Sequence, residues 1–562
     1  MILDKKDLDN LVAEGGESCI YDIGNSKIAK IYKPSIDIKS KKSKIEKLIS
    51  IKLPSCVVKP LELVTDSSGK FIGYTMNFIK GCEEVKRLSN KKFVSSNGIN
   101  IQNITKLLVE IKNIVKELHS KNIFISDFND CNVLFDSTMN PYFIDVDSWT
   151  FESFKCEVAM EMFCDPLLVG NDFNESTDNY SFAVILFQTL TRLHPFGGTL
   201  KQNDIPIKER IKKSISVIGR KSEVIYPIMA TDYIFFGGEL ESDFGNIFNK
   251  NKRHLIDKSL DNLFSSLKFC DIHNDYYHSQ YSTCPLCNKN AVTVPVKVNA
   301  INGIPYRIKF SSDDIQIIMN SDLYYSTTNF YVNRQTGAKI KGKFGCYFPL
   351  YKESFLQVEQ DNIIYKGKTI PKFHKSLVII SGDNIYYIDK GLALNKANLS
   401  DKGNTFNKIS TVSSKTFFEV SGEHYFICSM FDGYSILNID GYNHELMSDQ
   451  PNNNYGLHYD TISKTWLFMF TDKRGKLFIK IFDKNKEIYS SESFKYTENL
   501  SNICYNNSTV YFPCQGKITA FNHVKNITKD FVLDIISPDC FLNFNKSGKI
   551  EVISDKIIYE VG

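Results

Sequence analysis

Hydrophobic residues recur with a helical period in three segments of the first half of the chain. Residues 104–120 place apolar side chains three or four positions apart, which predicts a long amphipathic helix. Residues 176–191 begin with a capping serine and then become almost wholly apolar, which predicts a buried helix. A shorter, lysine-rich helix is predicted for residues 41–51.

Strand-like segments separate these helices. Residues 27–33 alternate between apolar and polar positions, and residues 71–77 form a second strand that leads into a linker. Residues 122–136 have the pattern of strand, tight loop and strand, and residues 142–145 form the next short strand. Because the last two strands adjoin in a hairpin, we expect the polar residues at their ends to meet at one point.

The pattern changes after about residue 293, where short alternating or aromatic runs are broken by N-G, D-G, G-K and S-G turns. Comparable hairpins recur about every 40–50 residues, so residues 295–562 are expected to form a closed β-propeller of about six blades. One or two β-sandwiches are the alternative. The last strand, K-I-I-Y-E-V, is expected to pair with I-P-Y-R-I-K-F near residue 304, because closure removes exposed sheet edges.

Composition is that of a multidomain soluble protein. A length of 562 residues, 42% of them hydrophobic and 23% charged, allows several large cores. The net charge of +4 is too small to indicate nucleic acid or membrane as a partner. Fourteen mostly scattered cysteines and an N-terminus unlike a signal peptide favour a reducing cytoplasm.

The strongest chemical signal lies in the predicted strand–loop–strand segment. Asp127 and Asn132 stand in I-S-D-F-N-D-C-N, and Asp145 follows in Y-F-I-D-V-D-S-W. Phosphoryl transfer needs such a set, in which one carboxylate orients a hydroxyl while an Asn and a second carboxylate hold Mg²⁺. Upstream, Gly15 and Gly16 lie between two strand-like stretches and would let the backbone approach phosphates closely.

The order of these motifs resembles the protein-kinase fold, which implies a bilobal domain over residues 1–265, with lobes of about 1–80 and 81–265. The resemblance implies that Asp127 is the catalytic-loop aspartate and that Asn132 and Asp145 hold Mg²⁺. It implies that Lys30, rather than Lys33, contacts the α/β-phosphates of ATP.

The same resemblance assigns several supporting residues. Glu46, the only acid in the lysine-rich helix, becomes the ion-pair partner of Lys30, and Asp178 becomes the anchor of the catalytic-loop backbone. The remaining implied cofactor contacts are the gatekeeper and the adenine-contacting linker, which are Met76 and Asn77, Phe78 and Ile79.

Departures from the usual pattern point to a particular group. Ile125 and Ser126 replace the usual His-Arg pair, Asp-Val-Asp replaces Asp-Phe-Gly, and Ser18 replaces a loop glycine. These features resemble a divergent group of bacterial protein kinases encoded beside phosphatase and von Willebrand-type partner proteins. The resemblance implies a cytoplasmic serine/threonine-protein kinase. The alternative is a pseudokinase scaffold that binds nucleotide and a partner without phosphoryl transfer.

A second signal lies in residues 266–292, which are predicted to form a zinc ribbon. Cys270 and His273 form C-x2-H, and Cys284 and Cys287 form C-x2-C, which suits one tetrahedral, structural Zn²⁺. His278 is the competing ligand. No acid, base or metal set stands out in residues 295–562, so this region is expected to recruit or regulate a protein partner.

Overall fold

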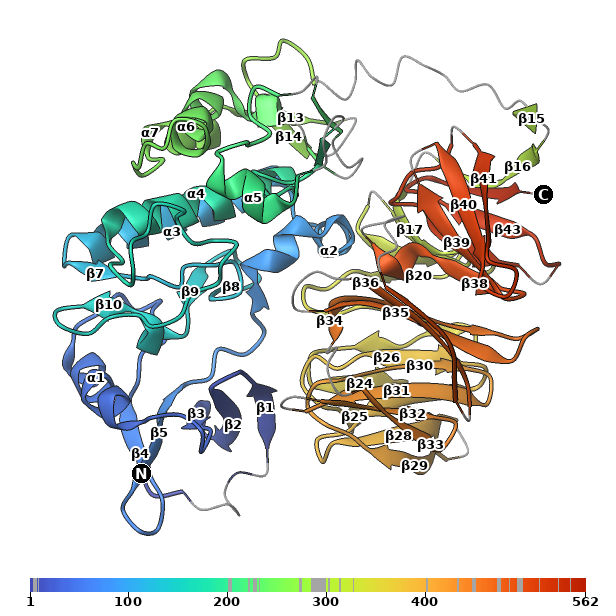
Figure 1. Ribbon diagram of the computed structural model, residues 1–562, viewed down its shortest axis with the longest axis horizontal. Helices are drawn as coiled ribbons and strands as arrows, with labels where there is room; N and C mark the ends of the chain where they lie inside the picture. The colour runs from blue at the N-terminus through green and yellow to red at the C-terminus, as the bar shows by residue number, and fades with distance from the viewer. Residues whose placement is uncertain are drawn as a thin grey trace. The chain divides into compact units, whose positions relative to one another are not determined.

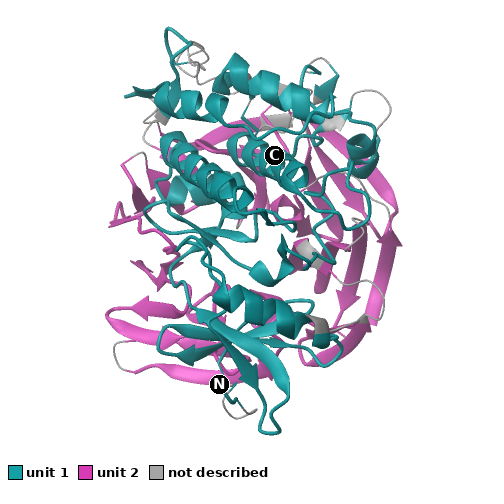
Figure 2. Cartoon of the chain, turned by 90° about the vertical axis from the view of Figure 1, so that its left-hand side faces the viewer, with its two compact units in different colours: residues 1–293 teal, residues 294–562 magenta. Residues whose placement is uncertain are grey.

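The computed structural model in Figure 1 covers the whole chain. It describes all residues except 4–7, 9, 201–204, 221, 222, 226–229, 232, 272–274, 285–299, 302, 303, 313, 314, 327, 401, 402, 432, 433, 447–450, 473–476, 485, 493–498, 515, 534, 546 and 562. The chain divides into two compact units, residues 1–293 and residues 294–562, which Figure 2 shows in different colours.

Unit 1, residues 1–293, begins with a five-stranded antiparallel sheet in the order β1-β2-β3-β5-β4. The strands are β1 (Leu11–Glu14), β2 (Ser18–Gly24), β3 (Lys27–Tyr32), β4 (Glu62–Thr65) and β5 (Phe71–Asn77). Helix α1 (Lys39–Ser50) connects β3 to β4. The ammonium of Lys59 donates to the carbonyls of Ile49 and Ile51 at the C-terminal end of α1, where a cation is favoured. The predicted strands at 27–33 and 71–77 and the helix at 41–51 are confirmed.

The two longest helices of unit 1 carry its core. Helix α3 (Ile101–His119) is amphipathic, and α4 (Glu175–Thr191) is buried along nearly its whole length. Asn100 and Asn174 cap them, each within a capping box that satisfies orphan N–H groups. Both predicted helices are therefore confirmed, but the cap of α4 is Asn174 and not the predicted serine, because the helix begins at Glu175. The other helices are α2 (Lys91–Ser96), α5 (Ile207–Lys212), α6 (Gly238–Phe248) and α7 (Lys258–Ser265), with 3₁₀ turns η2 (Val85–Ser89), η3 (Val146–Ser148) and η4 (Tyr233–Phe236).

Short strands surround these helices. A three-stranded sheet has the order β6-β8-β9, and three two-stranded sheets pair β10 with β7, β11 with β12 and β13 with β14. The strands are β6 (Glu83–Glu84), β7 (Ile123–Phe124), β8 (Val133–Phe135), β9 (Pro141–Phe143), β10 (Thr150–Phe151), β11 (Thr199–Leu200), β12 (Val224–Ile225), β13 (Leu267–Cys270) and β14 (Asp275–His278). The predicted strand, loop and strand over residues 122–136 correspond to β7, a loop and β8.

Unit 2, residues 294–562, consists of small antiparallel sheets. Four of them have four strands in sequence order: β26 (Val378–Ser381) to β29 (Thr405–Thr411), β30 (Thr416–Ser421) to β33 (Tyr442–Leu446), β34 (Pro451–Asp460) to β37 (Lys486–Glu492), and β38 (Cys504–Asn506) to β41 (Ile527–Val532). Their inner members are β27 (Asn384–Ile388), β28 (Ala393–Asn398), β31 (His424–Met430), β32 (Ser435–Ile439), β35 (Thr465–Asp472), β36 (Leu477–Asp483), β39 (Thr509–Cys514) and β40 (Lys517–Asn522).

The remaining strands of unit 2 form four further sheets. One has four strands, β17 (Ile315–Asn320), β18 (Leu323–Ser326), β19 (Phe330–Asn333) and β20 (Lys339–Lys341). Two smaller ones contain β21 (Leu350–Tyr351) with β22 (Ser354–Phe355), and β23 (Gln357–Val358), β24 (Asn362–Tyr365) and β25 (Lys368–Pro371). A five-stranded sheet has the order β15 (Ala300–Ile301), β16 (Ile304–Ser311), β44 (Ile557–Val561), β43 (Ile550–Ile553) and β42 (Phe541–Phe544).

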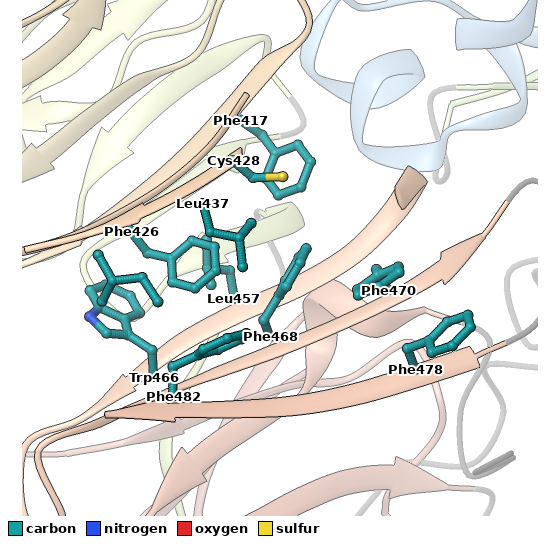
Figure 3. Close-up of a cluster of buried hydrophobic side chains, with 11 residues drawn as sticks. Phe417, Phe426, Cys428, Leu437, Leu457, Trp466, Phe468, Phe470, Phe478 and Phe482 are labelled. Atoms are coloured by element: carbon teal, nitrogen blue, oxygen red, sulfur yellow. The ribbon is translucent and has the colours of Figure 1, made fainter. Parts of the chain in front are cut away.

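Aromatic side chains fill the space between neighbouring sheets of unit 2. Figure 3 shows the cluster between the sheets β30–β33 and β34–β37, in which Phe426 lies against Trp466 and Phe468. Phe417 and Tyr455 stack with their ring centroids 4.0 Å apart. Such packing explains the many aromatic residues in this half, because each sheet buries its apolar face against the next one.

Two local predictions for unit 2 are confirmed. The last strand, β44, pairs antiparallel with β16, and Tyr306 lies opposite Val561. The predicted D-G turn between β32 and β33 is also present, with φ of 49° at Asp440 and 91° at Gly441. Glycine suits the second position because a side chain there would strain the left-handed backbone.

The predicted fold class is wrong. Strands take 41% of the chain and helices 19%, so the protein is mostly β, and a bilobal protein-kinase fold is not evident. Among the described strands there is no closed barrel or propeller, and the β-sandwich alternative does not describe these many small sheets either. Periodicity identifies hairpins correctly because pairing within a hairpin is local. It does not determine how successive sheets are arranged, since that depends on side-chain packing between them.

The predicted domain boundaries at 1–265, 266–292 and 295–562 stay predictions. Among the described helices, none combines the length and the apolar composition needed to cross a membrane.

Candidate functional site

A buried carboxylate fixes the backbone of the loop between β7 and β8. Asp178, on α4, is fully buried and accepts hydrogen bonds from the backbone N–H groups of Ile125 at 2.7 Å and Ser126 at 2.9 Å. His119 Nε2 lies 3.1 Å from the same carboxylate. Ser126 has a φ of 68°, a conformation that L-residues rarely adopt without support from their surroundings. The predicted anchoring role of Asp178 is confirmed.

The anchored loop presents Asp127, whose carboxylate is held by neighbouring amides. Asn129 Nδ2 donates to Asp127 Oδ1 at 2.9 Å, and Asn132 Nδ2 donates to Asp127 Oδ2 at 3.0 Å. The backbone N–H of Met160, from the segment that follows β10, also donates to Asp127 Oδ1 at 2.8 Å. Among the described residues, Oδ2 accepts one hydrogen bond, from Asn132, and so has a lone pair left for another donor.

Asn132 and Asp145 stand at the same end of the β8–β9 hairpin. Val133 pairs in register with Phe143, and Ile144 N–H donates to the Asn132 carbonyl at 3.0 Å. Asp145 follows directly, with a φ of 62° that turns the chain out of the strand direction. Asn132 and Asp145 therefore lie at one end of the hairpin, as predicted.

Lys30 lies at the centre of a group of side chains from β3, β5 and η3. Its ammonium donates to Asp145 and, at 2.6 Å, to Asp147 Oδ1. The hydroxyl groups of Tyr32 and Tyr74 donate to Asp147 at 2.8 and 2.9 Å. The side chains of Lys30 and Asp147 are only 9% and 5% exposed, whereas that of Asp145 is 37% exposed. Asp145 is therefore the carboxylate that stays open to a ligand.

The charges of this group stabilise one another. Burial alone would lower the pKa of Lys30, but Asp145 and Asp147 outweigh it and raise that pKa above its usual value. Burial alone would raise the pKa of Asp147, but Lys30 and the hydroxyls of Tyr32 and Tyr74 hold it below its usual range. Lys30 and Asp147 are consequently both charged at neutral pH.

The predicted Lys30–Glu46 pair is not formed. The Glu46 side chain is 52% exposed and lies 3.8 Å from the ammonium of Lys42, one helical turn away. Helix α1 instead buries Lys44, whose ammonium donates to the Lys155 carbonyl at 3.3 Å. Burial lowers the pKa of Lys44 to about 8. The prediction that Glu46 pairs with Lys30 is wrong. It rested on Glu46 being the only acid of the helix, but the sequence pattern of a weakly amphipathic helix does not determine which residues face inward.

The predicted nucleotide contacts lie on or next to the five-stranded sheet. Gly15 and Gly16 form the turn between β1 and β2, closed by the hydrogen bond from Gly15 N–H to the Ser18 carbonyl at 2.8 Å. A Cβ at Gly16 would meet no atom within 4 Å, so packing within the protein does not require glycine there.

At the other end of the sheet, Met76 is buried on β5 opposite Ile28, and Asn77 is exposed. Phe78 and Ile79 follow in half-buried positions, and the Phe78 N–H donates to the Ser26 carbonyl at 2.8 Å.

The predicted zinc ligands are only partly described. Cys270 ends β13, and both Cys270 and Cys284 are buried, while His273 and Cys287 lie outside the described residues. The competing ligand, His278, accepts a hydrogen bond at Nδ1 from the Gln280 N–H at 3.0 Å. Its Nε2 faces Gly237, where an added Cβ would come within 3.0 Å of that nitrogen. The choice between His273 and His278 stays a prediction.

Asp147, Tyr32, Tyr74 and Asn129 were not predicted as site residues. Tyr32 stands two positions after Lys30 on one strand, so the alternation of strand faces could have identified it. Asp147 stands two positions after Asp145 in the same motif. Tyr74 lies opposite Lys30 across β3 and β5, a register that the sequence alone does not give.

Comparison of the chain with models of known protein families gives no match, and comparison with curated proteins gives none either. Within the described residues, no group of three or more His, Cys, Asp or Glu side chains is arranged to hold a metal ion.

Proposed function

We propose that unit 1 catalyses ATP- and Mg²⁺-dependent phosphoryl transfer to a serine or threonine hydroxyl of a partner protein. The observation that carries the proposal is a group of polar residues at one end of the β8–β9 hairpin. Lys30 binds Asp145, Asp145 follows Ile144, whose N–H binds the Asn132 carbonyl, and the Asn132 side chain binds Asp127. Phosphoryl transfer is catalysed largely by positioning and charge stabilisation, and this group offers both.

Lys30 supplies a positive charge for the phosphates of ATP. It is nearly buried, and the surrounding carboxylates keep it protonated. Gly15 and Gly16 have no side chains, so the backbone of their turn could approach the phosphates closely. Packing within the protein does not explain the glycine at position 16, because a Cβ there would meet no atom within 4 Å.

Asn132 and Asp145 have the donor atoms that Mg²⁺ prefers. The Asn132 amide nitrogen binds Asp127, so its amide oxygen is directed away from that carboxylate, and the Asp145 side chain is more than one third exposed. Protein sites for nucleotide-bound Mg²⁺ commonly supply one or two such oxygens, with the phosphates and water completing the coordination. When bound, the ion neutralises charge on the phosphates.

Asp127 orients the acceptor hydroxyl. Its Oδ2 keeps a lone pair that can accept the hydroxyl proton, while Asn129 and Asn132 fix the plane of the carboxylate. The adenine ring would lie against the segment from Met76 to Ile79. Because the Phe78 N–H is already bound to Ser26, adenine would use other backbone groups of this segment.

Unit 2 is proposed to recruit or regulate the protein partner, in the cytoplasm. The partners implied by the resemblance, a phosphatase and a von Willebrand-type protein, are the first candidates to assay.

The second candidate function is a scaffold that binds nucleotide without transferring phosphate. It is favoured by the Met160 N–H, which occupies one oxygen of Asp127 in the site. Nucleotide binding does not separate the two functions, since both predict it.

Transfer of labelled γ-phosphate to protein separates them. Wild-type chain should label itself or a partner, and Asp127→Ala should reduce the rate by at least about a hundredfold, since a positioned base contributes that much. Asp136→Ala is the matched control, because Asp136 lies at the opposite end of the β8–β9 hairpin, where its carboxylate accepts hydrogen bonds from Thr138, Asn140 and Tyr142. Equal rates in wild type and Asp127→Ala would refute the assignment.

A further inference from the structure

Asp147 is a nearly buried carboxylate that accepts three hydrogen bonds. Its Oδ1 accepts hydrogen bonds from Lys30 and from the Tyr74 hydroxyl, and its Oδ2 accepts one from the Tyr32 hydroxyl. The three donors come from two adjacent strands, β3 and β5, and the side chain is 5% exposed. A carboxylate so enclosed and satisfied has a fixed position, and it fixes the ammonium that it binds.

Helix α1 contributes no acid to Lys30. Glu46 is exposed and pairs with Lys42, whereas Lys44 is the charged residue that the helix buries. The Lys44 ammonium lies near the Phe151 ring, 6.0 Å from its centroid, and donates to the Lys155 carbonyl. The inward face of α1 therefore carries a cation, which can attract Asp147 but cannot pair with Lys30.

We infer that Asp147 is the residue that positions Lys30 for phosphate binding, in place of an acid on helix α1. This inference rests on the proposed function. The two carboxylates of the Asp-Val-Asp motif then have separate tasks. Asp147 holds Lys30 through Oδ1, and its Oδ2 binds the Tyr32 hydroxyl. Asp145, which is 37% exposed, is left for Mg²⁺.

One consequence concerns the dependence of the site on helix α1. Lys30 lies on β3, its anchoring tyrosines lie on β3 and β5, and Asp147 lies on η3. Its position is therefore set without a residue of α1, and displacement of the helix would not by itself remove the partner of Lys30.

The test compares Asp147→Asn with the matched control Glu46→Gln in full-length protein. Each variant removes one negative charge and keeps nearly the same shape. Asp147→Asn should lower kcat/KM for Mg·ATP by roughly a hundredfold, the cost of misplacing a phosphate-binding group, and should leave the KM for the acceptor protein unchanged. Glu46→Gln should change kcat/KM by less than about twofold, because exposed ion pairs contribute little.

A double variant separates positioning from general stability. Lys30→Met with Asp147→Asn should be no slower than Lys30→Met alone, because Asp147 acts through Lys30. Thermal unfolding of each variant shows whether it is folded. Should Asp147→Asn fail to fold, Tyr32→Phe and Tyr74→Phe keep the carboxylate, remove one hydrogen bond each, and should lower kcat/KM in the same direction.

Four results would overturn the inference. Glu46→Gln as slow as Asp147→Asn would place the partner of Lys30 on helix α1. If Asp147→Asn lowers kcat/KM as much in the Lys30→Met background as in wild type, Asp147 acts independently of Lys30. Wild-type rates in Asp147→Asn would refute this inference alone, whereas a wild-type chain that transfers no phosphate would refute the proposed function and this inference with it.

Discussion

Replacing Asp178 with alanine tests the physical basis of the site without assuming any activity. The carboxylate is fully buried and accepts from two backbone N–H groups, those of Ile125 and Ser126. A hydrogen bond to a charged group contributes about 1.5–3 kcal/mol, so losing both should lower the free energy of unfolding of unit 1 by about 3–6 kcal/mol. The left-handed backbone at Ser126 would also lose its support.

Tryptophan fluorescence can follow unit 1 alone. The chain has two tryptophans, Trp149 in unit 1 and Trp466 in unit 2, and both are buried. In a Trp466→Phe background, urea unfolding followed by fluorescence reports on Trp149. With a slope of about 3 kcal/mol/M, Asp178→Ala should lower the midpoint by about 1–2 M.

Asp172→Ala is the control for this measurement. Asp172 is 77% exposed and forms an ion pair with Lys155 at 3.3 Å, so its loss should cost less than about 1 kcal/mol. If Asp178→Ala lowers the unfolding free energy by less than about 1 kcal/mol, the carboxylate does not hold the loop, and the reasoning from buried hydrogen bonds is refuted.

The remaining predictions concern the turn at Gly15 and Gly16, the half-buried His194 and the predicted zinc site. Gly16→Ala should fold like wild type, because its Cβ meets no atom within 4 Å, but should raise the KM for ATP by up to about tenfold in a kinetic assay if the turn covers phosphates. Burial lowers the pKa of His194 from 6.5 to about 4. Between these pH values the unfolded chain binds a proton at His194 and the folded chain does not. The free energy of unfolding of unit 1 should therefore fall by up to about 3 kcal/mol as the pH falls from about 6.5 to 4. In the same fluorescence assay, His194→Gln should make the unfolding free energy less dependent on pH. If the pH dependence is the same as in wild type, His194 is not its source. Elemental analysis should find about one zinc per chain, lost in Cys284→Ser with Cys287→Ser, whereas metal-free protein of equal stability would contradict the zinc site.

The sequence predicted the local elements well, for a physical reason that the individual segments illustrate. The strand at Lys27–Tyr32 and the helices at Ile101–His119 and Glu175–Thr191 are set by periodicity and caps, which act over a few residues. The pairing of β44 with β16 was also predictable, since both are alternating runs at the ends of one strand-rich region.

The arrangement of larger bodies was not predictable in the same way. A closed propeller and a bilobal kinase fold were inferred from repeated spacing and motif order, and neither spacing nor order specifies packing between sheets. The partner of Lys30 shows the same limit at the scale of one residue. Glu46 was the only acid of its helix, but the burial of Lys44 and the register that brings Tyr74 opposite Lys30 decide which carboxylate is bound.

The central claim, transfer of phosphate by the group around Asp127, is tested most directly by a single-turnover experiment. Full-length protein in excess is mixed with γ-labelled ATP and Mg²⁺, with the partner protein present, and the fate of the label is followed. The account predicts that label leaves ATP and appears on serine or threonine of protein, that chelation of Mg²⁺ prevents this, and that Asp127→Asn slows it by at least about a hundredfold. Label that stays in bound ATP, or that appears only as inorganic phosphate, would contradict the account.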